Sequence, residues 1–140
     1  MEKATIQQKS RDFAIRIINC YKYLTEEKKE FVMSKQLLRC GTSIGANRRP
    51  SERRAKLAWA FPSEKEEDEV NTRESKNAQS RTDFLSKLSI ALKEADETAY
   101  WLDLLQATDY LDKKMFDSLN DDCTEIIKML TAIIKTLKEK

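Results

Sequence analysis

Residues 81–107, RTDFLSKLSIALKEADETAYWLDLLQA, are the stretch that decides the fold. They contain neither Gly nor Pro, the two residues that most strongly interrupt a helix. Apolar residues recur at steps of three and four, the spacing of one face of a helix. They are Phe84, Leu88, Ala91, Leu92, Ala95, Ala99, Leu102 and Leu105. The pattern predicts one long amphipathic helix that ends before Asp109 and needs partners to bury its stripe.

Three further segments show the same spacing, at residues 9–24, from about 27 to 44, and at 113–137. Their stripes are Phe13, Ile17, Tyr21 and Leu24; Met33, Leu37, Cys40 and Ile44; and Phe116, Leu119, Cys123, Ile126, Leu130, Ile133 and Leu137. Helices with narrow stripes and short connections pack most readily side by side in alternating directions. The sequence therefore predicts an all-α fold, an up-and-down antiparallel four-helix bundle that forms a single domain over residues 1–140.

The composition favours the same class of protein. The 140 residues suit one domain, and 2 Gly and 2 Pro are too few for a turn-rich β fold. No run of about 18 apolar residues occurs, and residues 1–10 are polar with mixed charge. We therefore expect a cytoplasmic protein with no membrane partner. The odd number of cysteines, 3, fits a reducing compartment better than a secreted disulfide framework.

The residue types also argue against catalysis. The chain has no His, and its cysteines lack the C-x-x-C spacing of a zinc site. No nucleophile, base and orienting group stand at a recognisable spacing. We expect no enzyme activity, no metal site and no cofactor. Gly41 and Gly45 lie in a GTSIG element without the Lys or the preceding strand of a phosphate-binding loop. We interpret them as small residues that let two helices approach closely.

Residues 48–71 differ from the rest of the chain. Residues 48–56, RRPSERRAK, hold five basic residues and one Glu, whereas residues 64–69, EKEEDE, hold five acids and one Lys. Pro50 would end a helix, so we predict a loop-like insertion between the second and third helices. One interpretation is a solvated loop whose basic half folds on its acidic half. The other makes Arg48, Arg49, Arg53 and Arg54, with Trp59 and Phe61, a nucleic-acid contact. The adjacent acids count against it.

Charged residues also lie on the apolar-rich helices. Arg39 on the second helix and Glu94 and Glu97 on the third are predicted to form an interhelical ion pair, and the alternative is a catalytic or ligand-binding carboxylate. A buried Arg39–Glu97 pair would set helix register more than stability, because burial costs desolvation. Tyr100, Trp101 and Tyr110 flank the third stripe and favour a subunit interface.

Three stretches together resemble a known family: LLRCGTSIGAN at 37–47, DFLSKLSIAL at 83–92 and KEADETAYWLDLL at 93–105. They are similar to the 23S rRNA-intervening-sequence proteins, small bacterial four-helix bundle proteins, some of them encoded within ribosomal RNA genes. Without residues 48–71 the chain is close to the family's usual size, which supports the insertion. The resemblance implies assembly as a ring, typically a homopentamer. A similar bundle serves diversity-generating retroelements, where a basic ring binds a reverse transcriptase and nucleic acid.

Two classes of function follow. The first is a non-enzymatic oligomeric bundle that binds RNA or a ribonucleoprotein partner. Its contact candidates are Lys35, Arg39, Arg48, Arg49, Arg53 and Arg54. The second is a protein-interaction scaffold without nucleic-acid affinity, which binds through Trp59 and Phe61. The net charge of +2 is low for an electrostatic nucleic-acid binder. Residues 1–47 are nevertheless basic and residues 83–140 acidic, so a ring could be basic on one face.

Overall fold

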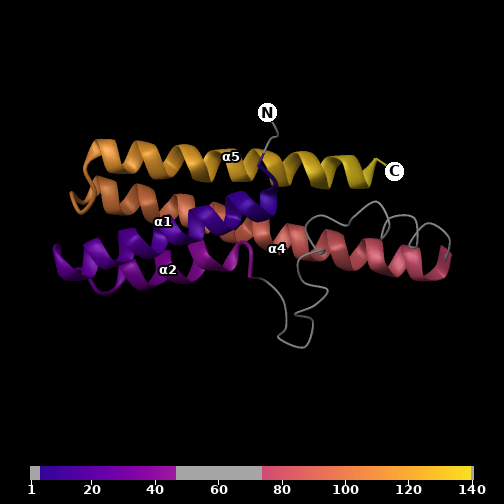
Figure 1. The fold of residues 1–140 in the computed structure, drawn as a ribbon, viewed down its shortest axis with the longest axis horizontal. Helices are drawn as coiled ribbons and strands as arrows, with labels where there is room; N and C mark the ends of the chain where they lie inside the picture. The colour runs from indigo at the N-terminus through magenta and orange to yellow at the C-terminus, as the bar shows by residue number, and fades with distance from the viewer. Residues whose placement is uncertain (1–3, 47–73, 140) are drawn as a thin grey trace.

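The computed structural model describes residues 4–46 and 74–139, which form four helices. They are α1 (Ile6–Glu26), α2 (Met33–Ser43), α4 (Glu74–Ala107) and α5 (Lys113–Lys138). The helices lie alongside one another in alternating directions (Figure 1). The described residues contain no strand, and the predicted all-α four-helix bundle is confirmed.

The order of the helices around the bundle follows from their contacts. α1 packs against α2 and α5, and α4 packs against the same two helices from the other side. α2 and α5 therefore lie diagonally opposite each other. The α1–α2 turn and the α4–α5 turn close the same end of the bundle, and α4 projects beyond its neighbours at the other end (Figure 1).

The core consists mainly of the predicted stripes. Phe13, Ile17 and Leu24 of α1 are fully buried, as are Leu88, Leu102 and Leu105 of α4. Leu119, Cys123, Ile126 and Leu130 supply the α5 side. Seven other predicted stripe positions are only half-buried and pack against this core: Met33, Phe84, Leu92, Ala99, Phe116, Ile133 and Leu137. Tyr21 is half-buried and lies outside the core cluster, and Ile134 is the buried residue near the end of α5.

The predicted start of the second helix near residue 27 is wrong. α1 continues to Glu26, and α2 begins only at Met33. Lys29 has a φ of 55°, and the Glu30 N–H donates to the Leu24 carbonyl over 2.9 Å. This hydrogen bond spans one residue more than the 6→1 bond of a Schellman ending, and it closes the end of α1 around the left-handed Lys29. No Gly marks it, because Lys29 occupies the left-handed position.

Glu30 then caps α2. Its carboxylate accepts hydrogen bonds from the backbone N–H groups of Val32, Met33 and Ser34 at 3.0, 2.9 and 2.7 Å. These are donors that the first turn of a helix leaves unpaired. Glu30 is 7% exposed, and the three N–H groups compensate the desolvation of its carboxylate. The turn between the two helices is therefore rigidly built.

Two other helix starts agree more closely with the sequence, whereas the start of α4 does not. α5 begins at the predicted Lys113, with the Asp112 side chain accepting from the Met115 N–H. α1 begins with a capping box between Thr5 and Gln8. α4 begins at Glu74, two turns before the predicted residue 81.

Gly41 and Gly45 lie where α1 and α2 come closest. A Cβ atom on Gly41 would stand 2.8 Å from Cγ1 of Ile17, and one on Gly45 would stand 3.0 Å from Cβ of Ser10. The contact at Gly41 is closer than real Cβ atoms tolerate without displacement, and the contact at Gly45 is tighter than most. The interpretation of the GTSIG element as a close helix contact is confirmed.

Candidate functional site

The predicted contact residues fall into two groups. Arg48, Arg49, Arg53 and Arg54 lie outside the described residues, as do Trp59, Phe61 and the predicted 48–71 insertion. Both interpretations of that segment stay predictions. Lys35 and Arg39 are described, and both are exposed on α2.

Arg39 lies within ion-pair distance of Glu97. Nη2 of Arg39 is 3.8 Å from Oε2 of Glu97, and the same nitrogen donates to Oε1 of Gln36 over 3.0 Å. The two ion-paired side chains are 58% and 35% exposed. The pair thus joins α2 to α4 at the surface, whereas a pair inside the bundle was considered from the sequence. Surface pairs of this kind contribute up to about 1 kcal/mol.

Glu94, the other candidate carboxylate, does not lie within ion-pair distance of Arg39, which pairs with Glu97. Desolvation raises the pKa of Glu94, and the negative charge of Glu97 raises it further. Thr98, one turn along α4, is fully buried and donates its hydroxyl to the Glu94 carbonyl over 2.7 Å. Partial burial and a like charge one turn away account for this pKa shift without a catalytic role.

Two basic residues of the N-terminal half form ion pairs with acidic residues of α5. Lys9 forms an ion pair of 2.7 Å with Glu125. Arg16 pairs with Asp122 and donates to the backbone carbonyl and the hydroxyl of Ser118, at 3.2 and 2.7 Å. These contacts hold α1 to α5. They also neutralise two of the basic residues that give residues 1–47 their positive charge.

The four other described lysines of residues 1–47 have no ion-pair partner among the described residues: Lys22, Lys28, Lys29 and Lys35. The same is true of five lysines of α4 and α5: Lys93, Lys114, Lys128, Lys135 and Lys138. The first four lie in the last turns of α1, the α1–α2 turn or the first turn of α2. Phe31 and Val32 stand between them, 54% and 74% exposed. We call these six residues the α1–α2 turn surface. The turn also exposes Glu26 and Glu27, so its charge is mixed.

Phe31 and Val32 were missed from the sequence. Val32 falls within the helix predicted from about residue 27, but it precedes the first residue of α2 and is 74% exposed. The available signal was an apolar pair directly after the charged run TEEKKE at residues 25–30. This apolar pair is identified as exposed only when the first residue of α2, Met33, is known.

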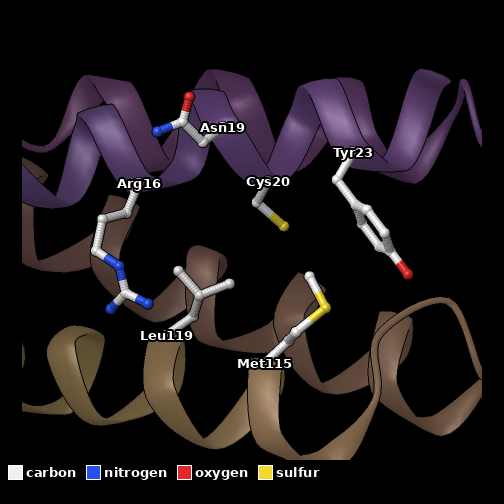
Figure 2. Close-up of a pocket in the computed structure, with 6 residues that line it drawn as sticks. All are labelled: Arg16, Asn19, Cys20, Tyr23, Met115 and Leu119. Carbon is white, nitrogen blue, oxygen red and sulfur yellow. The ribbon is translucent and has the colours of Figure 1, made fainter. Parts of the chain in front are cut away.

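A groove of about 250 Å³ runs between α1 and α5 at the same end of the bundle. Arg16, Asn19, Cys20 and Tyr23 line it from α1, and Met115 and Leu119 line it from α5. Figure 2 shows the Cys20 sulfur, Met115 and Leu119 pointing into the space between the two helices. Desolvation outweighs the effect of Arg16 and raises the pKa of Cys20 to about 11. Its thiol is therefore protonated at neutral pH and is a poor nucleophile.

Two other kinds of site have no candidate in the part of the chain that is described. No group of three or more His, Cys, Asp or Glu residues there is placed to hold a metal ion. Among residues 4–46 and 74–139, no helix is both long and apolar enough to cross a membrane.

Comparison with known proteins places the chain in a family. The family model described as 23S rRNA-intervening sequence protein matches residues 2–58 and 69–132. The chain belongs to the 23S rRNA-intervening sequence protein family. The match leaves only residues 59–68 uncovered between its two parts, a narrower stretch than the 48–71 insertion predicted from the sequence. No curated protein matches.

A solved structure shows the same fold. It is a protein of unknown function from the S23 ribosomal protein family of Bacteroides thetaiotaomicron. The two chains are 47% identical, with a TM-score of 0.70, and the similarity covers 94% of this chain and 99% of the other.

Proposed function

We propose that this member of the 23S rRNA-intervening sequence protein family is a non-enzymatic, self-associating bundle that binds RNA or a ribonucleoprotein partner in the cytoplasm. A homopentamer is the assembly that the resemblance implies. The α1–α2 turn surface supplies the RNA contact, and Lys28 and Lys29 at the tip of the turn are its central residues.

The observation that carries this proposal is the clustering of Lys22, Lys28, Lys29 and Lys35 at one end of the bundle, without ion-pair partners among the described residues. Unpaired lysines can neutralise phosphates and release counterions, which is the main source of affinity for nucleic acid. One copy offers few such charges. An oligomer that repeats the turn on one face would multiply them, and avidity would follow.

Non-enzymatic action is supported by residue chemistry. The sequence has no His, and the raised pKa of the Cys20 thiol in the groove disfavours a thiolate nucleophile. Buried, unpaired thiols at Cys20, Cys40 and Cys123 are in keeping with a reducing cytoplasm.

The second candidate function is a protein-interaction scaffold without nucleic-acid affinity. Two observations favour it. Exposed Phe31 and Val32 are typical of a protein-binding surface, and Glu26 and Glu27 partly cancel the neighbouring lysines. The two functions differ in their response to salt.

The experiment measures binding of a fluorescent, structured RNA by anisotropy over a series of salt concentrations. The wild-type protein should bind with an affinity that falls steeply as salt rises. A Lys28→Gln, Lys29→Gln variant should bind more weakly and lower the salt slope by about 2, one for each lost phosphate contact. Lys128→Gln with Lys135→Gln, two exposed lysines on α5, is the matched control and should leave the slope unchanged. Absence of RNA binding by the wild-type protein would reject RNA recognition and favour the scaffold.

A further inference from the structure

The outer side of α1 carries an exposed apolar pair between two basic residues. Ile15 and Ile18 are 42% and 39% exposed, although most large apolar side chains of the described residues are buried or half-buried. Arg11 comes one turn before this pair and Lys22 one turn after it. The four residues follow at steps of four, three and four, so they lie on one line along the helix. All four side chains are exposed, so this line faces solvent.

The apolar surface continues onto α2, which lies beside α1 (Figure 1). Ile17 and Gly41 mark a close approach of the two helices, since a Cβ on Gly41 would stand 2.8 Å from Cγ1 of Ile17. Tyr21 follows Ile17 by four residues, and Leu38 precedes Gly41 by three. Residues at these spacings are neighbours on a helix surface. Tyr21 and Leu38 therefore flank the approach from both sides, and both are half-buried.

Tyr21 has no place in the core of its own bundle. It follows the fully buried Ile17 by one turn, but it is half-buried and lies outside the core cluster. A partly exposed aromatic ring beside exposed aliphatic side chains is typical of a protein-binding surface. We call this surface the α1–α2 face, and its apolar residues are Ile15, Ile18, Tyr21 and Leu38.

The α1–α2 face is bordered by basic residues. Lys22 of α1 and Lys35 of α2 are exposed, and neither has an ion-pair partner among the described residues. Residues 13–25 and 31–46 contain no Asp and no Glu. The two helices therefore supply bases along the face without an acid between them.

The nearest acids stand at the margins of the face. Asp12 precedes it on α1 and lies 3.9 Å from Arg11. Glu97 belongs to α4 and lies 3.8 Å from Arg39. Glu26 is exposed at the last residue of α1. Two of these three acids stand beside a base of their own, so the face keeps a positive charge.

This combination selects the kind of partner. RNA is recognised through hydrogen bonds and through stacking on aromatic rings or guanidinium planes, and the exposed isoleucines offer neither. Aliphatic side chains gain most by packing against other apolar side chains. The ridges of paired helices receive the side chains of another helix, and an amphipathic helix offers an apolar stripe. Acidic residues beside that stripe complement Lys22 and Lys35.

We propose that the α1–α2 face binds an acidic amphipathic helix of a second protein, whose apolar stripe covers the face and whose carboxylates meet Lys22 and Lys35. The proposal goes beyond the RNA contact, which is centred on Lys28 and Lys29 at the tip of the turn. It requires no self-association, because the face lies on α1 and α2 of a single copy.

The probe is a fluorescein-labelled peptide of about 18 residues, longer than the shortest helices that are stable alone. It carries Leu at steps of three and four, Glu beside that stripe and Ala elsewhere. One control peptide has the same composition in scrambled order, and a second has Lys in place of Glu. The full-length wild-type protein should bind the acidic helical peptide at least about tenfold more tightly than either control in an anisotropy titration.

The first variant removes the centre of the face. Ile15→Ser combined with Ile18→Ser should weaken binding of the acidic peptide by about tenfold or more. Both positions are exposed, so the circular dichroism spectrum should stay that of the wild-type protein. Ile90→Ser, at a site 46% exposed on α4, is the matched control and should bind the peptide like the wild-type protein.

The second variant removes the charge and does not depend on the apolar residues. Lys22→Gln combined with Lys35→Gln should weaken peptide binding and flatten its salt dependence, because fewer charge pairs remain to be screened. Lys128→Gln combined with Lys135→Gln, on exposed positions of α5, should change neither.

The outcomes separate this proposal from the RNA contact. Equal binding of the three peptides, or undiminished binding by the Ile15→Ser, Ile18→Ser variant, would overturn it. A lower mass of that variant in light scattering would assign the face to a second copy, and loss of binding to anionic phospholipid vesicles would assign it to a lipid surface; either result would also overturn it. The Lys28→Gln, Lys29→Gln variant should bind the peptide like the wild-type protein, whether or not RNA binds.

Discussion

Glu30 and Ser34 bind each other twice across the first turn of α2. The Ser34 N–H donates to Oε1 of Glu30 over 2.7 Å, and the Ser34 hydroxyl donates to the Glu30 backbone carbonyl over 2.8 Å. Both residues are buried. These two hydrogen bonds from Ser34 fix the start of α2, directly after the exposed Phe31 and Val32.

The charge of Glu30 should therefore stabilise the fold in a pH-dependent way. Burial alone would raise the pKa of Glu30, but hydrogen bonds from Met33, Ser34 and Val32 outweigh it and hold the pKa below its usual range. A depressed folded-state pKa adds stability that is fully present above the unfolded-state pKa, near 4.3, and is lost as the pH falls through the folded-state pKa.

Glu30→Gln should lower the free energy of unfolding by about 1–2 kcal/mol at pH 7, the usual range for a lost cap. The difference from the wild-type protein should shrink as the pH falls below about 4. Urea unfolding at a series of pH values measures both quantities. A constant difference at all pH values would mean that the carboxylate charge does not stabilise the cap.

Lys29→Gly should make the protein more stable. Lys29 has a φ of 55°, and a left-handed conformation costs a residue with a Cβ roughly 1–2 kcal/mol. Glycine avoids that cost but loses more entropy on folding, so we expect a net gain of about 0.5–1 kcal/mol in the free energy of unfolding. Lys28→Gly, at the neighbouring position without a positive φ, is the control and should destabilise. A loss of stability in Lys29→Gly would show that the lysine side chain itself supports the turn.

Gly41→Ala should destabilise the α1–α2 contact. The added Cβ would stand 2.8 Å from Cγ1 and 2.9 Å from Cγ2 of Ile17. Overpacking of this kind costs about 1–3 kcal/mol, of which the better helix propensity of Ala returns up to about 1. Thermal unfolding of Gly41→Ala, of Ile17→Ala and of the double variant measures the coupling. The alanine at 41 should cost much less when Ile17 is already Ala, and additive losses would contradict a direct clash.

The Arg39–Glu97 pair should couple weakly. The Arg39 side chain is 58% exposed and the Glu97 side chain is 35% exposed. Water and dissolved salt therefore screen the 3.8 Å contact between them. A double-mutant cycle with Arg39→Met and Glu97→Gln should give a coupling below about 1 kcal/mol that falls in high salt. A coupling of several kcal/mol would indicate that the pair is desolvated in the assembled protein.

Periodicity was enough to predict the bundle but not the turn between α1 and α2. The stripe from Leu88 to Leu105 is long and needs no tertiary information. The end of α1 depends instead on Lys29 taking a left-handed conformation and on Glu30 folding back onto three N–H groups. Neither residue type is a usual signal for those roles. The α1–α5 groove could not be predicted from periodicity either, because residues that line it, such as Cys20 and Met115, are far apart in the sequence.

The fold also reduces the basic surface that residues 1–47 offer to a partner. Residues 1–47 are basic by residue count, but Lys9 and Arg16 form ion pairs with acidic residues of α5. Arg39 likewise lies within ion-pair distance of Glu97. Only contacts in three dimensions separate these from Lys28 and Lys29. The contact surface that remains is smaller and lies at one end of the bundle.

The most direct test is the mass of the wild-type protein, measured by light scattering on a gel-filtration column in the presence of structured RNA. Absorbance at 260 and 280 nm is recorded across the same peak. We predict an assembly of several 16.3 kDa subunits, near five, that carries excess absorbance at 260 nm at low salt and loses it at high salt. A 16.3 kDa monomer that elutes apart from the RNA at low salt would contradict it.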